Sequence, residues 1–410
     1  MTRTEKLLAG LIALPSVNPA FVPSAPSVGP RCRAASDDQQ VVPTNTHTGE
    51  KRVADFLAAT AARAGLEVEF QKVLPGRPNL IVRLLPPNRI RQTILLAPHL
   101  DTVGADESQF VPRWKNGRLH GRGACDTKGS VAAMFTALCE LAESKSRPAE
   151  TEIVFAGLVD EEHAQAGSRA FVGQASSLSP SFKKIRDRQD ACPTVLAIVG
   201  EPTKLQVVTA HKGSLWLELE TRGKAAHGAT PRLGKNAVRE MARIVEVLET
   251  DYAARLQKRR HPLLGTATVS VGTICGGTQP NIVPDRCAIT IDRRTLPGQT
   301  EATVRREIAA LLKSKKLRAK ISSAKLVPAL ALETDPKLPL VRQFLWDIGQ
   351  ARPVGADFFC DAAVLSAGGI PSVVFGPGDI AQAHTADEWI SISALERGKD
   401  LLLKFLKSLP

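Results

Sequence analysis

Apolar and polar positions follow two different patterns along the chain, and the change falls near residue 205. Before it, short apolar runs at 93–101, 151–160 and 195–203 alternate with segments of helical periodicity, the clearest at 126–142. Apolar runs of this length between helices are typical of strands buried on both faces of a parallel sheet. We therefore predict an α/β domain with a mostly parallel, doubly wound sheet.

The N-terminal part of this domain is predicted to begin with an amphipathic helix that ends near Pro15. A segment rich in Pro, Ser and polar residues follows at 20–47, and its lack of periodicity predicts a surface loop or a partly disordered insertion. A second helix at 49–64 and strands at 66–73 and 79–85 complete this part. No apolar stretch approaches the roughly 20 residues of a membrane-spanning helix, so we expect no membrane partner.

Beyond residue 205 the pattern changes to alternation between apolar and polar residues, first seen at 213–222. This alternation predicts a strand in a sheet with one covered face. The segments that follow are, in order, a helix at 236–250, strands at 266–274 and 285–293, a helix at 300–314 and a strand at 319–327. The order β-α-β-β-α-β is typical of a ferredoxin-like unit. We therefore predict an inserted ferredoxin-like α+β domain.

The first pattern resumes after this insertion. The remaining predicted elements are helices near 338–350 and 361–368, a strand at 371–376 and a last helix at 391–408. A chain of 410 residues is long enough for two or three domains with a sizeable core. We expect a larger domain built from residues 1–206 and 329–410, interrupted by a smaller domain at 207–328.

The formal net charge of +13 raises the question of a polyanionic partner. The basic residues concentrate at 255–261 and 313–320, and both segments follow helix-like stretches. Only 4% of the residues are aromatic, so the stacking platforms that bind single-stranded nucleic acids are scarce. We interpret the charge as solvated helix ends and loops and expect no nucleic acid partner. An electric field that attracts small anionic substrates is the second interpretation.

The chain has seven cysteines. They lie far apart in the sequence and form no CxxC pair, at positions 32, 125, 139, 192, 275, 287 and 360. We therefore expect neither a disulfide framework nor a cysteine zinc site, and a reducing cytoplasm fits this composition.

Carboxylates and histidines gather where the predicted strands end. His99 and Asp101 end the first of these strands, Glu161 and Glu162 follow the next, and Glu201 follows the third. Two further candidates lie in a turn before a helix and in the loop after the last strand, Asp126 and His384. In open α/β sheets, sites form outside the carboxyl ends of the strands, so these side chains are expected to meet in one crevice. Alone, the acidic triplet would be a solvated turn and His99 a structural histidine, but coincidence at five strand ends is improbable.

The number of these candidates indicates more than one metal ion. An open catalytic zinc takes three protein ligands, so five or six candidates suit two divalent ions that share a carboxylate. Asp101 follows His99 on the same face of the strand and is expected to orient its imidazole. Neighbours on an extended chain point apart, so one of Glu161 and Glu162 is expected to bind metal and the other to accept a proton.

These motifs resemble those of the two-zinc aminoacylase and exopeptidase family, which includes acetylornithine deacetylase, succinyl-diaminopimelate desuccinylase, glutamate carboxypeptidase and aminoacylase-1. The resemblance covers nearly the whole chain and rests on motifs in the family's order. They are PHLDTV (98–103), GRGACDTKG (121–129), DEEHAQAGS (160–168), VGEPT (199–203), KAAHGATPRLGKNA (224–237), GGTQPNIVPD (276–285), DRR (292–294) and FGPGDIAQAHTADEW (375–389). The resemblance implies a zinc-exopeptidase-like fold in which the inserted domain serves as a lid and dimerisation domain.

The resemblance also implies roles for the clustered residues. It assigns one zinc to His99, Asp126 and Glu162 and the other to Asp126, Glu201 and His384, with Asp126 bridging; cobalt is the alternative metal. It makes Glu161 the general base and acid. Glu161 would deprotonate the attacking water and then protonate the leaving amine, while the two ions polarise the amide carbonyl.

Other implied roles concern the inserted domain. His227 is expected to reach the active site of a neighbouring subunit and stabilise the oxyanion, which predicts a homodimer. Asn281 and Arg294 match positions that contact the substrate carboxylate, and Arg suits this role through its bidentate fork. Without the resemblance, His227 would be an exposed loop histidine and Arg294 a solvated charge at a strand end. The remaining candidates, His120, His163, His211 and Cys125, are expected to be structural.

The substrate is expected to be a small N-acyl amino acid that contacts the segment 355–369. Desuccinylases have an Asp-x-Arg sequence here, but this chain has Ala363 in place of the Arg, which weakens the desuccinylase interpretation. Asp361 or Asp357 is expected to pair with a distal ammonium, and N-capping is the alternative role for Asp361. N-Acetylornithine in arginine biosynthesis is therefore the favoured substrate. A desuccinylase of lysine biosynthesis, a dipeptidase or carboxypeptidase, and a non-catalytic basic binding protein are the alternatives.

Overall fold

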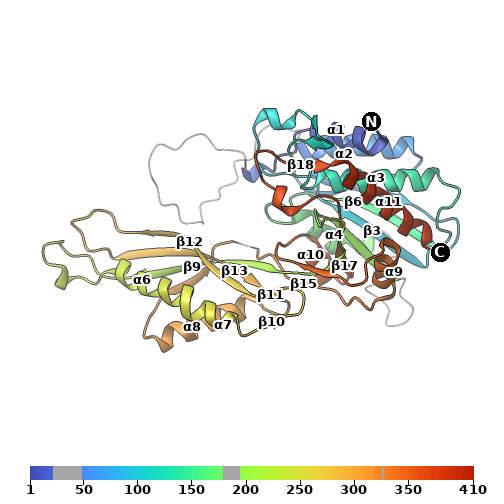
Figure 1. The fold of residues 1–410 in the computed structure, drawn as a ribbon. Helices are drawn as coiled ribbons and strands as arrows, with labels where there is room; N and C mark the ends of the chain where they lie inside the picture. Colours follow the sequence, from blue (N-terminus) through green and yellow to red (C-terminus); the bar gives the residue numbers. More distant parts are fainter. Residues whose placement is uncertain (22–48, 179–193, 326) are drawn as a thin grey trace.

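The computed structural model describes residues 1–21, 49–178, 194–325 and 327–410, so the loop predicted at 20–47 lies almost entirely outside the described residues. The chain forms two bodies that lie side by side (Figure 1). The large domain contains a nine-stranded sheet covered by helices, and the small domain contains a four-stranded sheet with helices on one face.

The large sheet is parallel at its centre and antiparallel toward both edges. The central strands β6 (Thr151–Gly157), β3 (Gln92–Pro98), β7 (Thr194–Gly200) and β17 (Ser372–Val374) are all parallel. The order across the main path of the sheet is β1 (Glu67–Leu74), β2 (Arg77–Leu84), β6, β3, β7, β17, β8 (Val208–His211) and β15 (Leu332–Glu333), with β16 (Val354–Ala356) paired to β8. The prediction of a mostly parallel α/β sheet is therefore confirmed.

Helices cover the large sheet on both faces, as a doubly wound fold requires. One face packs against α1 (Arg3–Ile12), α2 (Gly49–Arg63), α3 (Lys128–Glu143), α9 (Pro339–Ile348) and α11 (Ile392–Ser408). The other face packs against α4 (Ala166–Leu178) and α10 (Ala362–Ala367). Most of α3 is buried, since it lies between the sheet and the helices α1 and α11. This burial holds the start of α3 in a fixed position, and Asp126 lies just before it.

The small domain has the predicted ferredoxin-like topology. Its antiparallel sheet has the order β12 (Thr268–Gly276), β13 (Arg286–Thr295), β9 (Gly213–Arg222) and β14 (Lys320–Ser323). The helices α6 (Ala237–Val247), α7 (Ala253–Leu256) and α8 (Glu301–Ser314) pack on one face and share a hydrophobic core with it. The other face of β12 remains open to solvent over much of its length.

The boundary between the two domains differs slightly from the expected one. β8 pairs with β17, β15 and β16 in the large sheet, so the chain leaves this sheet after His211 and not at residue 206. It enters the small sheet at Gly213 and returns to the large sheet at β15. β8 has only four residues and directly precedes the longer alternating run of β9. The sequence pattern therefore did not distinguish the two strands.

A third, small sheet was not predicted. It consists of β4 (Arg113–Lys115), β5 (Arg118–His120) and β18 (Trp389–Ser391), which are too short to show periodicity in the sequence. It links the loop after His384 to the turn before Asp126. In the part of the chain that the structure describes, no helix is both long and apolar enough to cross a membrane.

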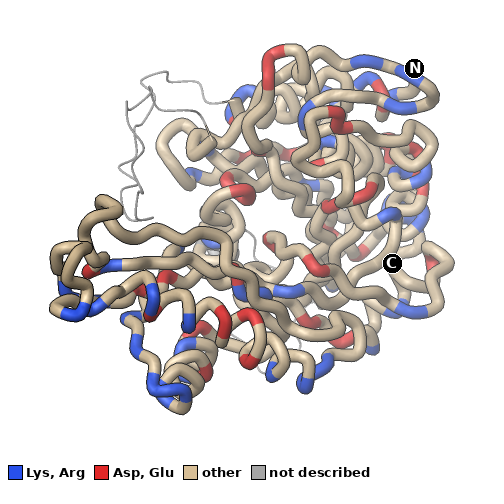
Figure 2. Tube along the Cα trace, turned by 60° about the vertical axis from the view of Figure 1, so that its left-hand side comes forward, with Lys and Arg blue, Asp and Glu red and all other residues tan. Residues whose placement is uncertain are grey.

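The basic segments of the chain lie on the small domain, around the end of α7 and the end of α8 (Figure 2). Several of these charges are paired with acidic residues close by. Arg259 contacts Glu307 at 3.1 Å and Lys315 contacts Asp251 at 2.6 Å. Local pairing of this kind supports the interpretation of these segments as solvated protein surface.

The described cysteines are mostly reduced. Cys125, Cys139, Cys287 and Cys360 are free and buried. Cys275, at the end of β12, is disulfide-bonded, which is a single bond and not the disulfide framework that the sequence argued against.

Candidate metal centre and active site

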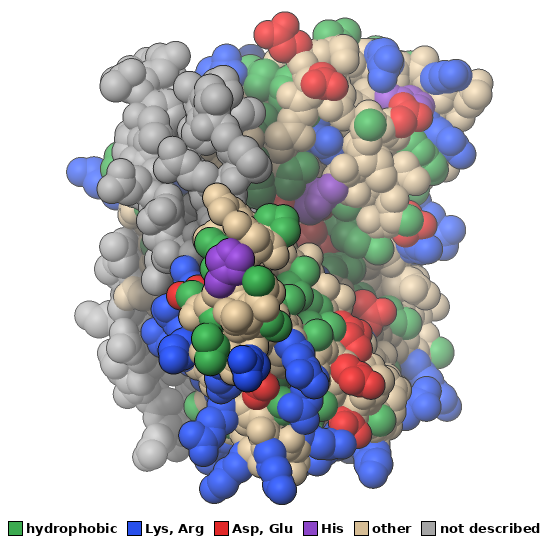
Figure 3. Space-filling view, turned by 90° about the vertical axis from the view of Figure 1, so that its left-hand side faces the viewer, with side chains coloured by type: hydrophobic (Ala, Val, Ile, Leu, Met, Phe, Trp, Pro, Cys, Tyr) green, Lys and Arg blue, Asp and Glu red, His purple; other side chains and the backbone are tan. Residues whose placement is uncertain are grey.

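Three parallel strands bring their C-terminal residues to one edge of the large sheet. His99 follows β3, Glu161 and Glu162 follow β6, and Glu201 follows β7. The register places Pro98 beside Gly200, so the residues after these two strands begin at the same level. Around this edge the surface between the two domains is hollowed, and histidine and acidic side chains gather there (Figure 3).

Asp126 lies between the two predicted histidine ligands. One carboxylate oxygen, Oδ1, is 3.1 Å from His99 Nε2, and the other, Oδ2, is 3.3 Å from His384 Nε2. Burial alone would raise the pKa of Asp126, but hydrogen bonds from His384 and His99 hold this pKa below its ordinary value. Each oxygen thus faces a different histidine, which is the arrangement that a bridging carboxylate needs.

The two glutamate ligands lie beside different histidines. Glu162 Oε2 is 3.2 Å from His384 Nε2, whereas Glu201 Oε1 is 3.9 Å from His99 Nε2. Ligand atoms of one tetrahedral zinc lie roughly 3.3 Å apart, given metal–ligand distances of about 2.0–2.1 Å. These contacts favour the sets His99–Asp126–Glu201 and Asp126–Glu162–His384, in which the two glutamates exchange the places that the resemblance implied.

The residues around Asp126 fit a metal centre. Ligand atoms of His99, Asp126 and Glu162, the set that the resemblance implied for one ion, also lie within 4.8 Å of one another, so the preference for the exchanged sets rests on the shorter contact between Glu162 and His384. Burial raises the pKa of Glu162 and that of Glu201 above their ordinary values, with nearby carboxylates contributing. Buried carboxylates so close together need positive charge, and two imidazoles with three carboxylates are the donors that zinc and similar divalent ions take.

Glu161 lies beside the cluster, close enough to Glu201 and Glu162 for their charges to affect it. The turn that carries it begins with Asp160, whose φ of +67° is uncommon for a residue other than glycine. Burial raises the pKa of Glu161 well above its ordinary value, and the charge of Glu201 adds to this effect. A buried carboxylate with a raised pKa suits a group that accepts and returns a proton.

Asp101 holds this turn in place as well as the histidine. Its Oδ1 lies 3.3 Å from His99 Nδ1 and accepts a hydrogen bond from the backbone N–H of Glu161 at 3.1 Å. Its Oδ2 accepts one from the backbone N–H of Glu162 at 3.2 Å. The residue expected to orient His99 therefore also fixes the backbone of the candidate base.

A buried network behind Asp101 was not predicted from the sequence. The amide nitrogen of Asn18 donates to Asp101 Oδ2 at 2.8 Å and to Asp160 Oδ1 at 3.0 Å. Arg77 donates to the same oxygen of Asp160 at 2.9 Å and forms a two-pronged pair with Glu50. The network gives Asp160 fixed partners and thereby supports its left-handed backbone. No sequence signal pointed to Asn18, since it precedes the poorly patterned segment at 20–47.

Glu388 performs a similar task for Asp126. Its Oε1 accepts hydrogen bonds from the backbone N–H groups of Cys125 and Asp126 at 2.8 and 2.9 Å. Its Oε2 accepts from Gly123 N–H at 2.9 Å and from Arg122 Nη1 at 2.7 Å. The side chain is fully buried. Glu388 was part of a quoted motif but had no assigned role, because its partners only become apparent in three dimensions.

His227 and Asn281 lie together on two loops of the small domain. The backbone N–H of Gly228 donates to Asn281 O at 2.7 Å, and His227 bridges to Ile282. His227 and Asn281 are both exposed. Within the described residues, neither side chain forms a hydrogen bond or ion pair with the metal centre, so the structure does not bring these two predicted site residues into the site of the same chain.

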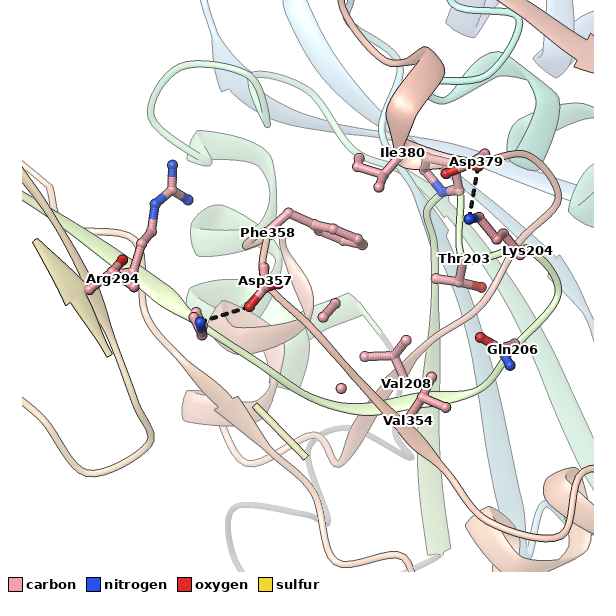
Figure 4. Close-up of a pocket in the computed structure, with 15 residues that line it drawn as sticks. Thr203, Lys204, Gln206, Val208, Arg294, Val354, Asp357, Phe358, Asp379 and Ile380 are labelled. Atoms are coloured by element: carbon pink, nitrogen blue, oxygen red, sulfur yellow. Dashed lines mark ion pairs between the residues drawn. The ribbon is translucent and has the colours of Figure 1, made fainter. Parts of the chain in front are cut away.

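A cavity of about 680 Å³ is lined by residues of both domains. Arg294 and Asp357 line it, together with Phe358 and Ile380, and Figure 4 shows these side chains around the hollow. Arg294 pairs with Asp292 at 2.9 Å and is one-third exposed. Pro202 and Thr203, which directly follow Glu201 in the sequence, line the cavity, but none of the five predicted metal ligands does.

Asp361 lies outside this cavity. Its side chain is buried, its Oδ1 accepts a 2.5 Å hydrogen bond from Ser168 Oγ, and its Oδ2 has no hydrogen-bond partner. It precedes α10 without capping it through its side chain, so the capping alternative is wrong. Burial raises the pKa of Asp361 to about 7. Of the two aspartates considered for a distal ammonium, Asp357 is the one that the cavity exposes.

His120, His211 and Cys125 have local partners, as expected for structural residues. His120 contacts Asp387 at 3.1 Å, and His211 is buried in β8 with its Nδ1 2.9 Å from Lys212 O. The thiol of Cys125 donates to Asp379 O at 3.3 Å, and burial raises its pKa. A thiol with a raised pKa is a poor nucleophile.

Comparisons with known proteins agree with this geometry. Residues 95–408 match the model of peptidase family M20/M25/M40. The acetylornithine deacetylase of Myxococcus xanthus is 28% identical over 393 residues, which are 92% of this chain and 96% of that protein.

Two solved structures share the fold. Aminopeptidase PepT from Bacillus cereus superimposes with a TM-score of 0.68 at 21% identity, over 99% of this chain and 97% of that one. The YXEP protein of Bacillus subtilis, described as a dinuclear metal-binding peptidase, gives 0.65 at 13% identity, over 99% and 97% of the two chains. The predicted resemblance to the two-zinc exopeptidases is confirmed. The chain is a metal-dependent hydrolase and belongs to peptidase family M20/M25/M40.

Proposed function

We propose that this protein hydrolyses the amide bond of an N-acyl amino acid, with N-acetylornithine as its substrate. The observation that carries the proposal is the position of Glu161 beside the cluster of His99, Asp126 and the two glutamate ligands. Several relatives at 27–29% identity are acetylornithine deacetylases, which supports the choice of acyl group and amino acid.

Two divalent ions, zinc or cobalt, would be held by the clustered side chains. Their contacts support His99 and Glu201 on one ion, Glu162 and His384 on the other, and Asp126 on both. When bound, such ions polarise the amide carbonyl and make a water molecule acidic enough to lose a proton near neutral pH. Asp101 would keep the imidazole of His99 in the orientation that exposes Nε2 to the metal.

Glu161 would carry the proton through the reaction. Its carboxylate accepts a proton from the attacking water and then delivers it to the amine nitrogen as the amide C–N bond breaks. The backbone of Glu161 is held by Asp101, so the carboxylate does not need to be positioned during the reaction.

The small domain would supply the remaining contacts. Arg294 lines the cavity and presents a guanidinium to the substrate carboxylate. His227 and Asn281 lie on loops without contact to the metal centre of their own chain, so they would serve a second subunit. We therefore propose a homodimer formed through the small domain.

The side chain of the substrate favours N-acetylornithine over succinyl-diaminopimelate. Ala363 is buried and supplies no cation where a desuccinylase would have an Arg, whereas Asp357 places a carboxylate in the cavity. A non-catalytic basic binding protein would have no need for the seven residues that meet at the metal centre. A desuccinylase or a dipeptidase remains the alternative that shares this scaffold.

The test is a comparison of substrates with the zinc-loaded full-length protein. N-Acetylornithine, N-succinyl-diaminopimelate and a neutral dipeptide are offered at equal concentration, and the release of free amine is measured. The proposal predicts the highest kcat/KM for N-acetylornithine. A preference for the succinyl compound or the dipeptide would keep the amide chemistry and refute the assigned substrate.

A further inference from the structure

The cavity between the domains contains an ion pair whose two partners differ strongly in exposure. Lys212 Nζ lies 2.7 Å from Asp357 Oδ1, and the lysine side chain is 9% exposed whereas the aspartate side chain is 85% exposed. Both residues line the cavity, and a dashed line from the labelled Asp357 marks their ion pair in Figure 4. The ammonium is therefore fixed in the wall of the cavity, while its carboxylate partner stands in solvent.

The lysine depends on this pair more than the aspartate does. A buried ammonium without an anion is costly, so Lys212 needs a carboxylate at this position. Among the described residues, Asp357 is the carboxylate that contacts Lys212, and Lys212 is the only cation paired with Asp357. An exposed carboxylate loses little when it exchanges one partner for another, since water solvates it throughout.

The surroundings of the pair suit a substrate that carries both charges. Arg294 lines the same cavity and adds a second cation on the side of the small domain. Apolar side chains line the same cavity, among them Val208, Val354 and Phe358. Charged groups beside an apolar surface match a carboxylate and an ammonium joined by a short aliphatic chain.

We propose that the pair of Lys212 and Asp357 recognises the two charges of an N-acyl diamino acid by exchanging partners with it. The carboxylate of the substrate replaces Asp357 at Lys212, and the released Asp357 binds the side-chain ammonium. In the free protein, Asp357 occupies the place of the substrate carboxylate. This inference rests on the proposed amide hydrolysis and assigns specificity to two residues that the reaction itself does not use.

The experiment compares three compounds that differ in one charge each. They are N-acetylornithine, N-acetylnorvaline, which lacks the ammonium, and N-acetylornithine amide, which lacks the carboxylate. KM and kcat are measured with the metal-loaded wild type, Lys212→Met and Asp357→Asn. Lys204→Met is the matched control, because Lys204 also lines the cavity and pairs with an aspartate, Asp379, at 2.9 Å.

The two variants are expected to lose different preferences. Lys212→Met should reduce the preference for N-acetylornithine over its amide by roughly tenfold or more, mainly through KM, because a charged hydrogen bond is lost. Asp357→Asn should lower kcat/KM for N-acetylornithine but raise it for N-acetylnorvaline, since the competing carboxylate is gone. If the pair had a merely structural role, Asp357→Asn would lower kcat/KM for both compounds. Lys204→Met should keep both preferences of the wild type.

The outcomes separate this inference from the proposed function. If the wild type hydrolyses these compounds and Asp357→Asn changes the values for N-acetylornithine and N-acetylnorvaline in the same direction, the exchange of partners is refuted and the amide hydrolysis stands. If Lys212→Met retains the wild-type preference for the carboxylate, the anion site is refuted. If the wild type hydrolyses none of the three, the proposed function fails first.

Discussion

His384 Nε2 lies 3.2 Å from Glu162 Oε2, although 222 positions separate the two residues in the sequence. The other histidine, His99, lies on the opposite oxygen of Asp126 and has Glu201 as its neighbour. These contacts favour two sets of ligands that share one carboxylate. Each set would offer three protein ligands to an ion, the number that an open catalytic zinc site takes.

The shared carboxylate predicts the effect of Asp126→Asn on metal content. An amide has one oxygen to offer, so the variant cannot bridge two ions. We expect the wild type to retain two zinc ions per chain after dialysis and the variant to retain at most one, as measured by elemental analysis. Asp55→Asn, an exposed aspartate on α2, is the control and should retain both ions. Two tightly held ions in Asp126→Asn would contradict the bridging role.

Replacement of Asn18 by Leu tests the network behind Asp101. Leu is similar in size but cannot donate, so Asp101 and Asp160 each lose a hydrogen bond. Partners of metal ligands typically contribute about 10- to 100-fold to activity or metal affinity. We expect kcat to fall by roughly this factor with KM for the substrate nearly unchanged. An unaltered kcat, measured with confirmed metal content, would show that the network has no part in positioning Glu161.

Glu388→Gln is expected to destabilise the fold as well as the metal centre. The amide of Gln would turn a donor toward N–H groups that now have an acceptor, and Arg122 would lose its buried counter-charge. Breaking a buried ion pair costs about 3–5 kcal/mol. Urea unfolding of the metal-free protein measures this loss. Asp387→Asn, at the neighbouring position, is the control, because the side chain of Asp387 is mostly exposed. An equally small loss of unfolding free energy in both variants would contradict the structural role of Glu388.

His211 predicts a pH dependence of stability. Burial lowers its pKa from 6.5 to about 4, so the folded protein binds this proton less readily than the unfolded chain. The stabilisation is complete above pH 6.5 and is lost as the pH falls toward 4, by about 1.4 kcal/mol per pH unit in that range. The free energy of unfolding can be measured with urea on metal-free protein at several pH values. It should depend less steeply on pH in His211→Gln than in the wild type. Identical slopes would mean that His211 is not buried in its neutral form.

Much of this architecture could be predicted because strands and their ends have strong sequence signals. The apolar runs that became β3, β6 and β7 each end beside a predicted ligand, and parallel strands bring such ends together. The strands β4, β5 and β18 were missed, since three residues show no periodicity.

The partners of the site residues were harder to predict. Which glutamate lies beside which histidine depends on the side-chain directions after the turn at Asp160. Asp160 has a left-handed backbone conformation, so these directions cannot be predicted from the alternation of an extended chain. Glu388 and Asn18 have partners that are distant in sequence, so neither residue stood out. The Lys212–Asp357 pair likewise joins β8 and β9 to the segment after β16, which no local pattern connects.

The most direct measurement of the central claim is the hydrolysis of N-acetylornithine by the zinc-loaded protein, with and without the side-chain carboxylate of Glu161. We expect release of ornithine by the wild type, a fall of kcat by at least about 100-fold in Glu161→Gln, and unchanged metal content in that variant. Glu67→Gln, an exposed glutamate on β1, should behave as the wild type. Equal turnover by the wild type and Glu161→Gln would contradict the account.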